Sequence, residues 1–428
     1  MKKEDNSFVL RGAVVYSGSE TELMAYEDAF VVCVNGVSEG VFTELPEVYK
    51  ALPLTDAGGM LIMPGMTDLH IHAPQYALRG SYMDLELLPW LNSYVFPEEA
   101  SYADLGYAKK AYEIFATEMR SGATARACVF ATAHQEATLL LMEMLEESGL
   151  MTFVGKVNMD RNVPDYYAES TEQSLLATRE WLEAVQNKGF KKTRPILTPR
   201  FTPSCSRELM QGLGKLAAEY DLPVQSHLSE NLSEIDFVKE LEPDVSCYAD
   251  SYLRAGLMGK DRPCVMAHCV WSDETEAEML KDNGAFIAHS PESNINLCSG
   301  VAPVKRYLAE GMHVGLATDV SAGTSASMFA AIRNAIYASK LRFRLYDENT
   351  APLSFPEAFY IATKGGGAFF GKAGSFEKGY LFDALILDDA SIPTARTGLS
   401  VSERAERFIY LGSEQLIRAK YVSGERVF

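Results

Sequence analysis

The sequence is poor in histidine, tryptophan and cysteine for its length. Its 428 residues include 7 His, 3 Trp and 7 Cys. The cysteines are odd in number and show no spacing typical of a disulfide framework, which favours a reducing cytosol. No apolar run reaches membrane-spanning length, and residues 1–6 turn acidic without the hydrophobic region of a signal peptide. We therefore expect a cytoplasmic protein with no membrane contact.

Basic residues are also few relative to acidic ones. The chain has 39 Lys and Arg against 58 Asp and Glu, a net charge of −19. No Lys/Arg cluster offsets this charge, so a DNA or RNA partner is disfavoured. The chain lacks an H-E-x-x-H helix and a phosphate-binding glycine loop. His134-Gln135-Glu136 with Pro263-Cys264 partly matches the cytidine-type deaminase signature, but Ala267 stands where the second thiolate is needed.

The middle of the chain alternates short apolar runs with segments of helical periodicity. Continuous apolar runs are typical of buried parallel strands, and the crossovers between such strands need helices. There are eight runs: 61–72, 124–131, 151–159, 194–201, 222–228, 263–270, 285–289 and 313–320. The pattern predicts a (β/α)8 barrel of the TIM type, with a doubly wound sheet as the alternative. The count of eight, and the polar residues at most run ends, favour the barrel.

The two ends of the chain differ from this middle part. Residues 7–64 read as short strands separated by Gly, Asn and acidic residues, and strand character returns at 381–387 and 419–422. We expect these strands to pair, so that both termini form one small β-sandwich domain. The predicted organisation is residues 1–64 and 371–428 in this domain and residues 65–370 in the barrel.

Five of the seven histidines fall at predicted strand ends. They are His70 and His72 after the first run, then His227, His268 and His289 after later runs. Residues i and i+2 of a strand point to the same side, so His70 and His72 can bind one metal ion. Barrel enzymes build their sites at the carboxyl ends of the strands, where these side chains would converge.

Asp319, at the end of the eighth run, completes a candidate metal site. Three imidazoles and one carboxylate, from His70, His72, His227 and Asp319, suit zinc, with iron as a possible substitute. His268 and Glu230 remain as proton-handling groups. Taken alone, His227 could be an ordinary core histidine, Glu230 a carboxylate at a helix start and Asp319 a turn residue. A barrel places all these strand ends side by side. Purely structural roles for all these residues at once are therefore disfavoured.

The chain resembles the amidohydrolase superfamily over nearly its whole length. The resemblance rests on Pro64-Gly65-Met66-Thr67-Asp68-Leu69-His70-Ile71-His72, on the order His227, His268, Asp319, and on the 379–384 segment. Some members carry a carboxylated Lys at strand four that bridges two metals. Here strand four ends in Thr198-Pro199-Arg200-Phe201, so the resemblance implies one metal per chain. The pairing of His227 with Glu230 resembles the deaminase branch, in which that Glu moves protons.

Within this branch the chain resembles the guanine deaminase family. The matching segments are 72–76, 88–98, 155–160, 199–206 and 226–231. The resemblance implies that Gln75 and Arg200 hydrogen-bond a purine base, with Phe201 and Trp90 lining its pocket. Each of these residues could otherwise be a loop polar group, a surface cation or a core aromatic. Ser290 and Glu292 depart from the pattern expected for the family, and Glu292 would add negative charge if it pointed inward.

The resemblance implies a hydrolase that acts on C–N bonds of cyclic amidines. The expected reaction is zinc-dependent hydrolysis of guanine to xanthine and ammonia, with Glu230, His268 and Asp319 as catalytic residues and a homodimer as the assembly. The nearest alternative is a deaminase of another amino-heterocycle, such as a pterin or an aminotriazine. A metal-free binding or scaffold protein is more distant, because a decayed site has no reason to keep four ligands and an acid.

Overall fold

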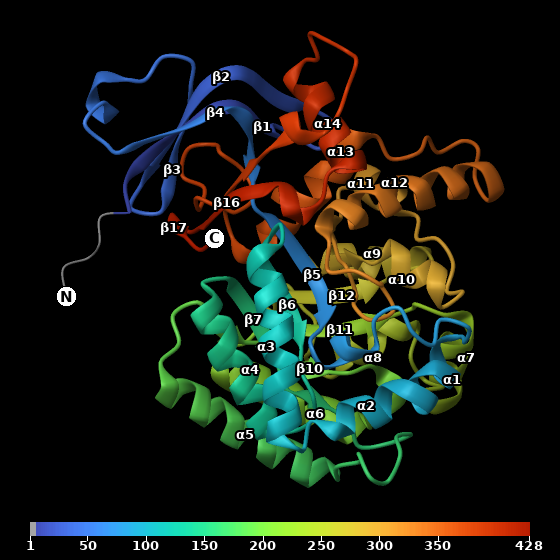
Figure 1. The fold of residues 1–428 in the computed structure, drawn as a ribbon. Coiled ribbons are helices and arrows are strands. Elements are labelled where there is room, and N and C mark those ends of the chain that lie inside the picture. The colour runs from blue at the N-terminus through green and yellow to red at the C-terminus, as the bar shows by residue number, and fades with distance from the viewer. Residues whose placement is uncertain (1–5) are drawn as a thin grey trace.

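The computed structural model describes residues 6–428, so the expectation that no signal peptide is present lies almost wholly outside the described residues. Figure 1 shows two parts: a sheet at the top, built from both ends of the chain, and a larger body of strands and helices below it. Among the described residues, no helix combines the length and the apolarity needed to cross a membrane.

The lower body is a (β/α)8 barrel, which confirms the predicted fold class. One parallel sheet joins β5, β6, β7 and β9, a second joins β11 to β14, and a bridge between Leu197 and Val224 connects the two. On the other side, the Asp319 amide donates to the His70 carbonyl at 2.9 Å, which links the end of β14 to β5. The strands are β5 (Met66–His72), β6 (Thr124–Phe130), β7 (Met151–Gly155), β8 (Val157–Asn158), β9 (Thr193–Pro195), β10 (Thr198–Pro199), β11 (Val224–Leu228), β12 (Cys264–His268), β13 (Phe286–His289) and β14 (His313–Leu316).

Helices surround the strands and begin at sequence signals typical of helix starts. Ser170 and Ser354, for example, form capping boxes with the residue three positions on. The helices are α1 (Leu87–Trp90), α2 (Phe96–Ser101), α3 (Leu105–Ser121), α4 (Gln135–Ser148), α5 (Thr171–Lys188), α6 (Arg207–Tyr220), α7 (Leu232–Leu241), α8 (Tyr248–Arg254), α9 (Glu274–Asp282), α10 (Pro291–Asn296), α11 (Val304–Ala309), α12 (Met328–Leu345), α13 (Phe355–Tyr360) and α14 (Val401–Leu411).

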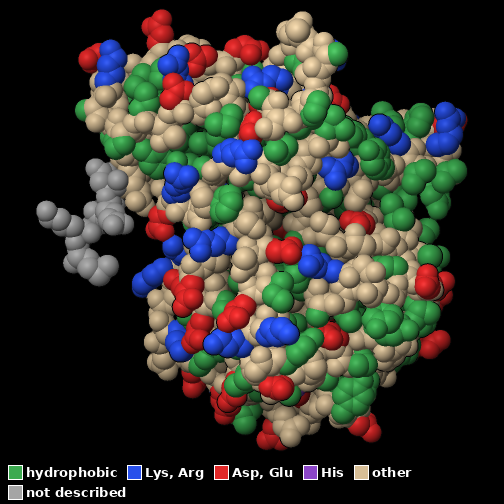
Figure 2. Space-filling view, viewed as in Figure 1, with side chains coloured by type: hydrophobic (Ala, Val, Ile, Leu, Met, Phe, Trp, Pro, Cys, Tyr) green, Lys and Arg blue, Asp and Glu red, His purple; other side chains and the backbone are tan. Residues whose placement is uncertain are grey.

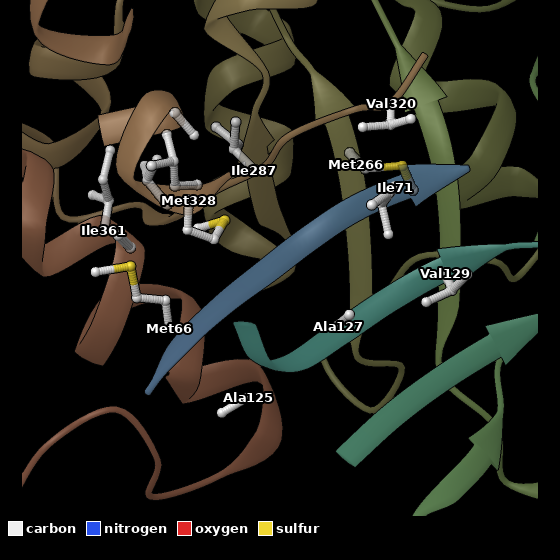
Figure 3. Close-up of a cluster of buried hydrophobic side chains, with 14 of the residues drawn as sticks. Met66, Ile71, Ala125, Ala127, Val129, Met266, Ile287, Val320, Met328 and Ile361 are labelled. Carbon is white, nitrogen blue, oxygen red and sulfur yellow. The ribbon is translucent and has the colours of Figure 1, made fainter. Parts of the chain in front are cut away.

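Side chains alternate between the inside of the barrel and the layer under the helices. Leu69, Cys128 and Ala288 are buried among others inside the barrel. Ala127 and Val129 of β6 point outward instead and lie close to Ile71 of β5, in a cluster drawn in Figure 3. Burial on both sides explains why the barrel strands appear as continuous apolar runs in the sequence.

The termini form one seven-stranded mixed sheet in the order β17-β16-β15-β4-β1-β2-β3. In Figure 1 its N-terminal strands lie beside β16 and α14, which come from the end of the chain. The strands are β1 (Phe8–Ser17), β2 (Leu23–Val34), β3 (Val37–Phe42), β4 (Leu54–Pro64), β15 (Ala384–Leu387), β16 (Ile417–Val422) and β17 (Glu425–Arg426). Strands from both ends thus pair as expected. The domain boundaries at residues 64/65 and 370/371 remain a prediction.

The structure differs from the sequence interpretation at two places. The first apolar run, 61–72, breaks at Gly65 into β4 of the terminal sheet and β5 of the barrel. A Cβ atom at Gly65 would lie 2.6 Å from the Cβ of Ala125, so the close approach of β6 requires glycine there. The C-terminal segment also contains α14, which was not predicted from the sequence; only strands were expected there.

A buried ion pair ties the sheet to the barrel at the amino ends of β5 and β6. Arg126 Nε lies 2.6 Å from Asp383 Oδ2, and Arg126 Nη2 lies 3.0 Å from Asp383 Oδ1. Both side chains are 1% exposed. Nearby, the Lys420 ammonium donates to the carbonyls of Met119, Gly122 and Thr124 at 2.9 to 3.0 Å. The two parts therefore share polar groups that water does not reach.

We expect Arg126→Met to lower the free energy of unfolding by about 3–5 kcal/mol, because it leaves the Asp383 carboxylate buried without its partner. Thermal and urea unfolding measure the loss. Arg11→Met is the matched control, since Arg11 pairs with Asp28 through two bonds of 2.9 and 2.6 Å on the exposed surface. Exposed pairs contribute little, so the control variant should unfold almost as the parent does. Equal losses in the two variants would contradict the special role of the buried pair.

Candidate metal and base-binding site

Four histidines from three barrel strands converge at the carboxyl end of the barrel. His72 Nε2 lies 3.2 Å from both His70 Nε2 and His227 Nε2. His70, His227 and His268 also offer nitrogens within 4.8 Å of one another. The structure thus brings together all three histidines predicted as metal ligands and adds His268 to the same group.

Asp319 joins this cluster from the end of the eighth strand. Its Oδ1 lies 3.1 Å from His70 Nε2 and 3.5 Å from His72 Nε2, and its Oδ2 lies 3.8 Å from His268 Nε2. The cap of the following helix, α12, is Ser327 rather than Asp319. Asp319 therefore has no capping role there and faces the histidines instead.

Hydrogen-bond partners set the tautomers of two histidines of the cluster. His227 Nδ1 lies 2.7 Å from the Arg200 carbonyl, which only accepts, so the hydrogen is on Nδ1 and Nε2 is free. His268 Nδ1 lies 2.9 Å from Asn294 Oδ1, and its Nε2 has no hydrogen-bond partner. Burial lowers the pKa of His70, His72 and His227 well below the usual value, with repulsion from the neighbouring histidines adding to the effect. Neutral imidazoles, two of which turn an unprotonated Nε2 toward the cluster, fit a bound cation.

Asp68, buried beneath the cluster on β5, fixes two backbone groups of the site. Its Oδ2 accepts from Thr318 Oγ1 at 2.5 Å, and its Oδ1 accepts from the Thr318 amide at 3.1 Å and the His70 amide at 3.3 Å. Burial raises the pKa of Asp68 to about 7. Asp68 therefore connects β5, which carries His70, to the turn that carries Asp319.

The strand ends adopt strained backbone turns at this site. His268 has φ of +75° and Asp319 has φ of +49°, a region that non-glycine residues rarely occupy. Ser229, which precedes Glu230, has φ of +47°. Such strain persists where surrounding structure imposes it, and it concentrates at functional sites.

Glu230 follows β11 and points toward the cluster. Its Oε2 lies 3.4 Å from His268 Nε2, and its Oε1 accepts from Ser299 Oγ at 2.9 Å. Asn231 and Glu234, not Glu230, cap α7. Burial, assisted by the charge of Asp319, raises the pKa of Glu230 to about 8. A carboxyl group with a pKa near neutrality can both take up and release a proton.

A cavity opens beside the cluster. All four residues predicted to bind a substrate line it: Gln75, Trp90, Arg200 and Phe201. His72, His227, Glu230, His268 and Asp319 line it as well, so one space reaches both groups.

Arg200 is a buried cation in this wall, not a surface one. Its Nη1 lies 2.6 Å from Glu99 Oε2, and the two side chains are 2% and 0% exposed. Gln75 Nε2 donates to Glu99 Oε1 at 2.9 Å. Glu99 was not among the predicted site residues; it lies on α2, one residue beyond the 88–98 segment that carries the resemblance.

Glu292, which the sequence analysis raised as a charge near the pocket, lies outside it. Its carboxylate accepts hydrogen bonds from Thr324 Oγ1 and, at 3.2 Å, from Asn334 Nδ2. It is absent from the residues that line the cavity. Ser290 is buried beneath the same turn. The departure from the family pattern therefore places no charge against a ligand.

Comparison with known proteins agrees with this geometry. The chain is 38% identical to the guanine deaminase of Dictyostelium discoideum over 378 residues, covering 87% of this chain and 83% of the relative. It is 34% identical to the guanine deaminase of Escherichia coli over 390 residues, covering 89% and 86%. Its fold matches that of a guanine deaminase from C. acetobutylicum, solved with guanine in the active site, with a TM-score of 0.95, 44% identity and coverage of 99% and 100%.

The family model described as "Amidohydrolase family" matches residues 61–427, which include the barrel and the C-terminal strands. This match spans every histidine of the cluster, Glu230 and Asp319. The chain belongs to the amidohydrolase family.

Proposed function

We propose that this protein is a guanine deaminase, which hydrolyses guanine to xanthine and ammonia. The observation that carries the proposal is the single cavity that joins a cluster of neutral imidazoles and carboxyl groups to a wall with a buried guanidinium. Relatives with this activity cover most of the chain, and the similar C. acetobutylicum structure holds guanine in its active site. In the reaction, water adds to the carbon that bears the exocyclic amine, and the C–N bond to that amine breaks.

We assign the metal to His70, His72, His227 and Asp319, with one zinc ion per chain. The lone pairs of buried neutral imidazoles and one carboxylate suit zinc, and iron is the alternative. When bound, such an ion supplies Lewis acidity that lowers the pKa of water to about 7.

The proton transfers are assigned to three side chains of this cavity. Glu230 takes a proton from the attacking water and passes it to the ring nitrogen beside the reacting carbon. Asp319 helps to deliver a proton to the departing ammonia. His268 hydrogen-bonds the attacking oxygen and stabilises the charge that develops there.

The base is held by the opposite wall of the cavity. The guanidinium of Arg200 offers only hydrogen-bond donors, so it fits the carbonyl oxygen of guanine. Gln75 offers an amide at the same wall, and Phe201 and Trp90 supply apolar faces for the ring. Cytoplasmic location and a homodimeric assembly complete the proposal; the seven free cysteines support the first.

The metal assignment predicts about one zinc per chain. His227→Ala should lose most of the metal, because the cluster then lacks one of its four ligands. His313→Ala is the matched control, since His313 is an exposed histidine outside the cluster. Elemental analysis of the purified proteins gives the stoichiometry. Two tightly bound ions per parent chain, or full occupancy in the His227 variant, would contradict the assignment.

Glu230→Gln keeps the size of the side chain but removes the transferable proton. We expect kcat for guanine to fall by about 10²- to 10⁴-fold, the usual loss of general acid–base help, with metal content unchanged. Glu292→Gln is the control, because Glu292 is a glutamate near the same end of the barrel that does not line the cavity. Ammonia release under saturating guanine measures both variants. Near-normal turnover in Glu230→Gln would remove Glu230 from the mechanism.

Arg200 predicts selectivity for guanine over adenine. Adenine carries an amino group where guanine has its carbonyl, and a guanidinium cannot accept from it, so discrimination of about 10⁴-fold or more is expected. A panel of guanine, adenine, pterins and aminotriazines tests this through ammonia release. Turnover of a pterin or aminotriazine in place of guanine would replace the substrate assignment.

Two substitutions of Arg200, assayed on the same panel, separate the effect of its charge from the effect of its shape. Arg200→Ala should lower kcat/KM for guanine with normal zinc content. Arg200→Lys keeps the charge but loses the planar fork of donors, so it should restore little of the loss. If Arg200→Ala deaminates guanine as the parent does, the cation has only a structural role.

A further inference from the structure

Glu99 is a fully buried carboxylate to which the proposed mechanism gives no role. It lies on α2, outside the barrel strands, and none of its surface is exposed. Its Oε1 accepts from Gln75 Nε2 at 2.9 Å, and its Oε2 accepts from Arg200 Nη1 at 2.6 Å and from Tyr167 OH at 3.2 Å. Two of these three donors line the cavity, although Glu99 itself does not. Glu99 therefore contacts two side chains of the base-binding wall without lining the cavity itself.

These contacts fix the orientation of both cavity-lining partners. A carboxylate only accepts, so the Gln75 amide must turn its Nε2 toward Glu99. Its Oε1 then faces the Ser321 amide at 3.5 Å. The guanidinium of Arg200 commits Nη1 to Glu99, and its Cζ lies 5.2 Å from the ring centre of Phe96 on the same helix. The remaining donors of both side chains are thereby held in one direction.

Glu99 also compensates the only positive charge among the residues that line this cavity, apart from any bound metal. Arg200 is permanently charged and 2% exposed, so without Glu99 an unpaired cation would face the ligand. An anionic ring would then gain an attraction that a neutral ring lacks. With Glu99 in place, the pair offers directed hydrogen-bond donors with little net charge.

We propose that Glu99 is a positioning residue that orients Gln75 and Arg200 and sets the preference of the cavity for neutral over anionic purines. The purine class of ligand rests on the proposed function. This role differs from that of a purely structural ion pair. Loss of a structural ion pair would not change the relative affinities of the cavity for neutral and anionic ligands.

The experiment compares how metal-loaded variants bind two oxopurines that lack the amine to be removed. Hypoxanthine is neutral at neutral pH, whereas urate carries one negative charge. Glu99→Gln removes the charge and keeps the shape, and Glu99→Asp keeps the charge but is too short to reach both partners. Glu242→Gln is the matched control: Glu242 is a buried carboxylate that accepts from Arg161 at 3.1 Å and from Arg207 at 2.5 Å, away from the cavity. Calorimetry gives Kd for each ligand.

We expect Glu99→Gln to shift the ratio of the two Kd values toward urate by about 10-fold or more, as for a unit charge several ångströms from an uncompensated cation. Glu242→Gln should leave the ratio at the parent value. Glu99→Asp should bind both ligands more weakly with an unchanged ratio.

An unchanged ratio in folded Glu99→Gln, or an equal shift in Glu242→Gln, would overturn the proposal. If Glu99→Gln does not fold, Glu99→Asp tests the orienting role, which parent-like binding would overturn. Arg200→Gln then tests the charge role, because it leaves the Glu99 carboxylate without its cation: the ratio should shift toward hypoxanthine, and a parent ratio would overturn the proposal. Because these measurements need no turnover, absence of ammonia release from guanine by the parent would remove the proposed function separately.

Discussion

The structure depends on a group of desolvated polar side chains that converge at one end of the barrel. His70, His72, His227, His268 and Asp319 are held by strands whose carboxyl ends meet, and all are buried except His227, which is partly exposed. Burying such groups without partners is costly. The Nε2 atoms of His70 and His227 each lie only 3.2 Å from that of His72. A cation among them turns the same arrangement into a favourable one, so the fold and the proposed chemistry share one requirement.

A second set of residues holds this arrangement in place. The Arg200 carbonyl orients His227, Asn294 orients His268, Ser299 fixes Glu230, and Asp68 connects β5 to the turn of Asp319. Outer partners of this kind set the tautomer and direction of ligating side chains. Arg200 contributes both to the support of the histidine cluster and to the cavity wall. Its carbonyl accepts a hydrogen bond from His227, and its guanidinium lines the cavity. The metal side and the base side of the site are thus linked through one residue.

The sequence predicted the elements whose signal is local. Apolar runs located the barrel strands, and the histidines at their ends located the cluster, because strand periodicity and barrel topology together determine where those side chains meet. Glu99 was missed because its partners, Gln75 and Arg200, are 24 and 101 residues away and no local pattern marks their meeting. The domain boundary was placed between residues 64 and 65, but the contact that requires glycine at position 65 was not predictable, because Ala125 belongs to the next strand. The direction of Glu292 depended on Thr324 and Asn334, which only the folded chain brings near.

Buried charged groups have different partners at the two ends of the barrel. At the amino ends, Arg126 and Asp383 neutralise each other, and the three hydrogens of the Lys420 ammonium match three backbone carbonyls. At the carboxyl ends, the Glu99–Arg200 pair is complete, but the histidine and carboxylate cluster beside it lacks a protein cation. The terminal sheet is attached at the amino ends of the strands, which leaves the carboxyl ends to the loops and to the cavity they enclose.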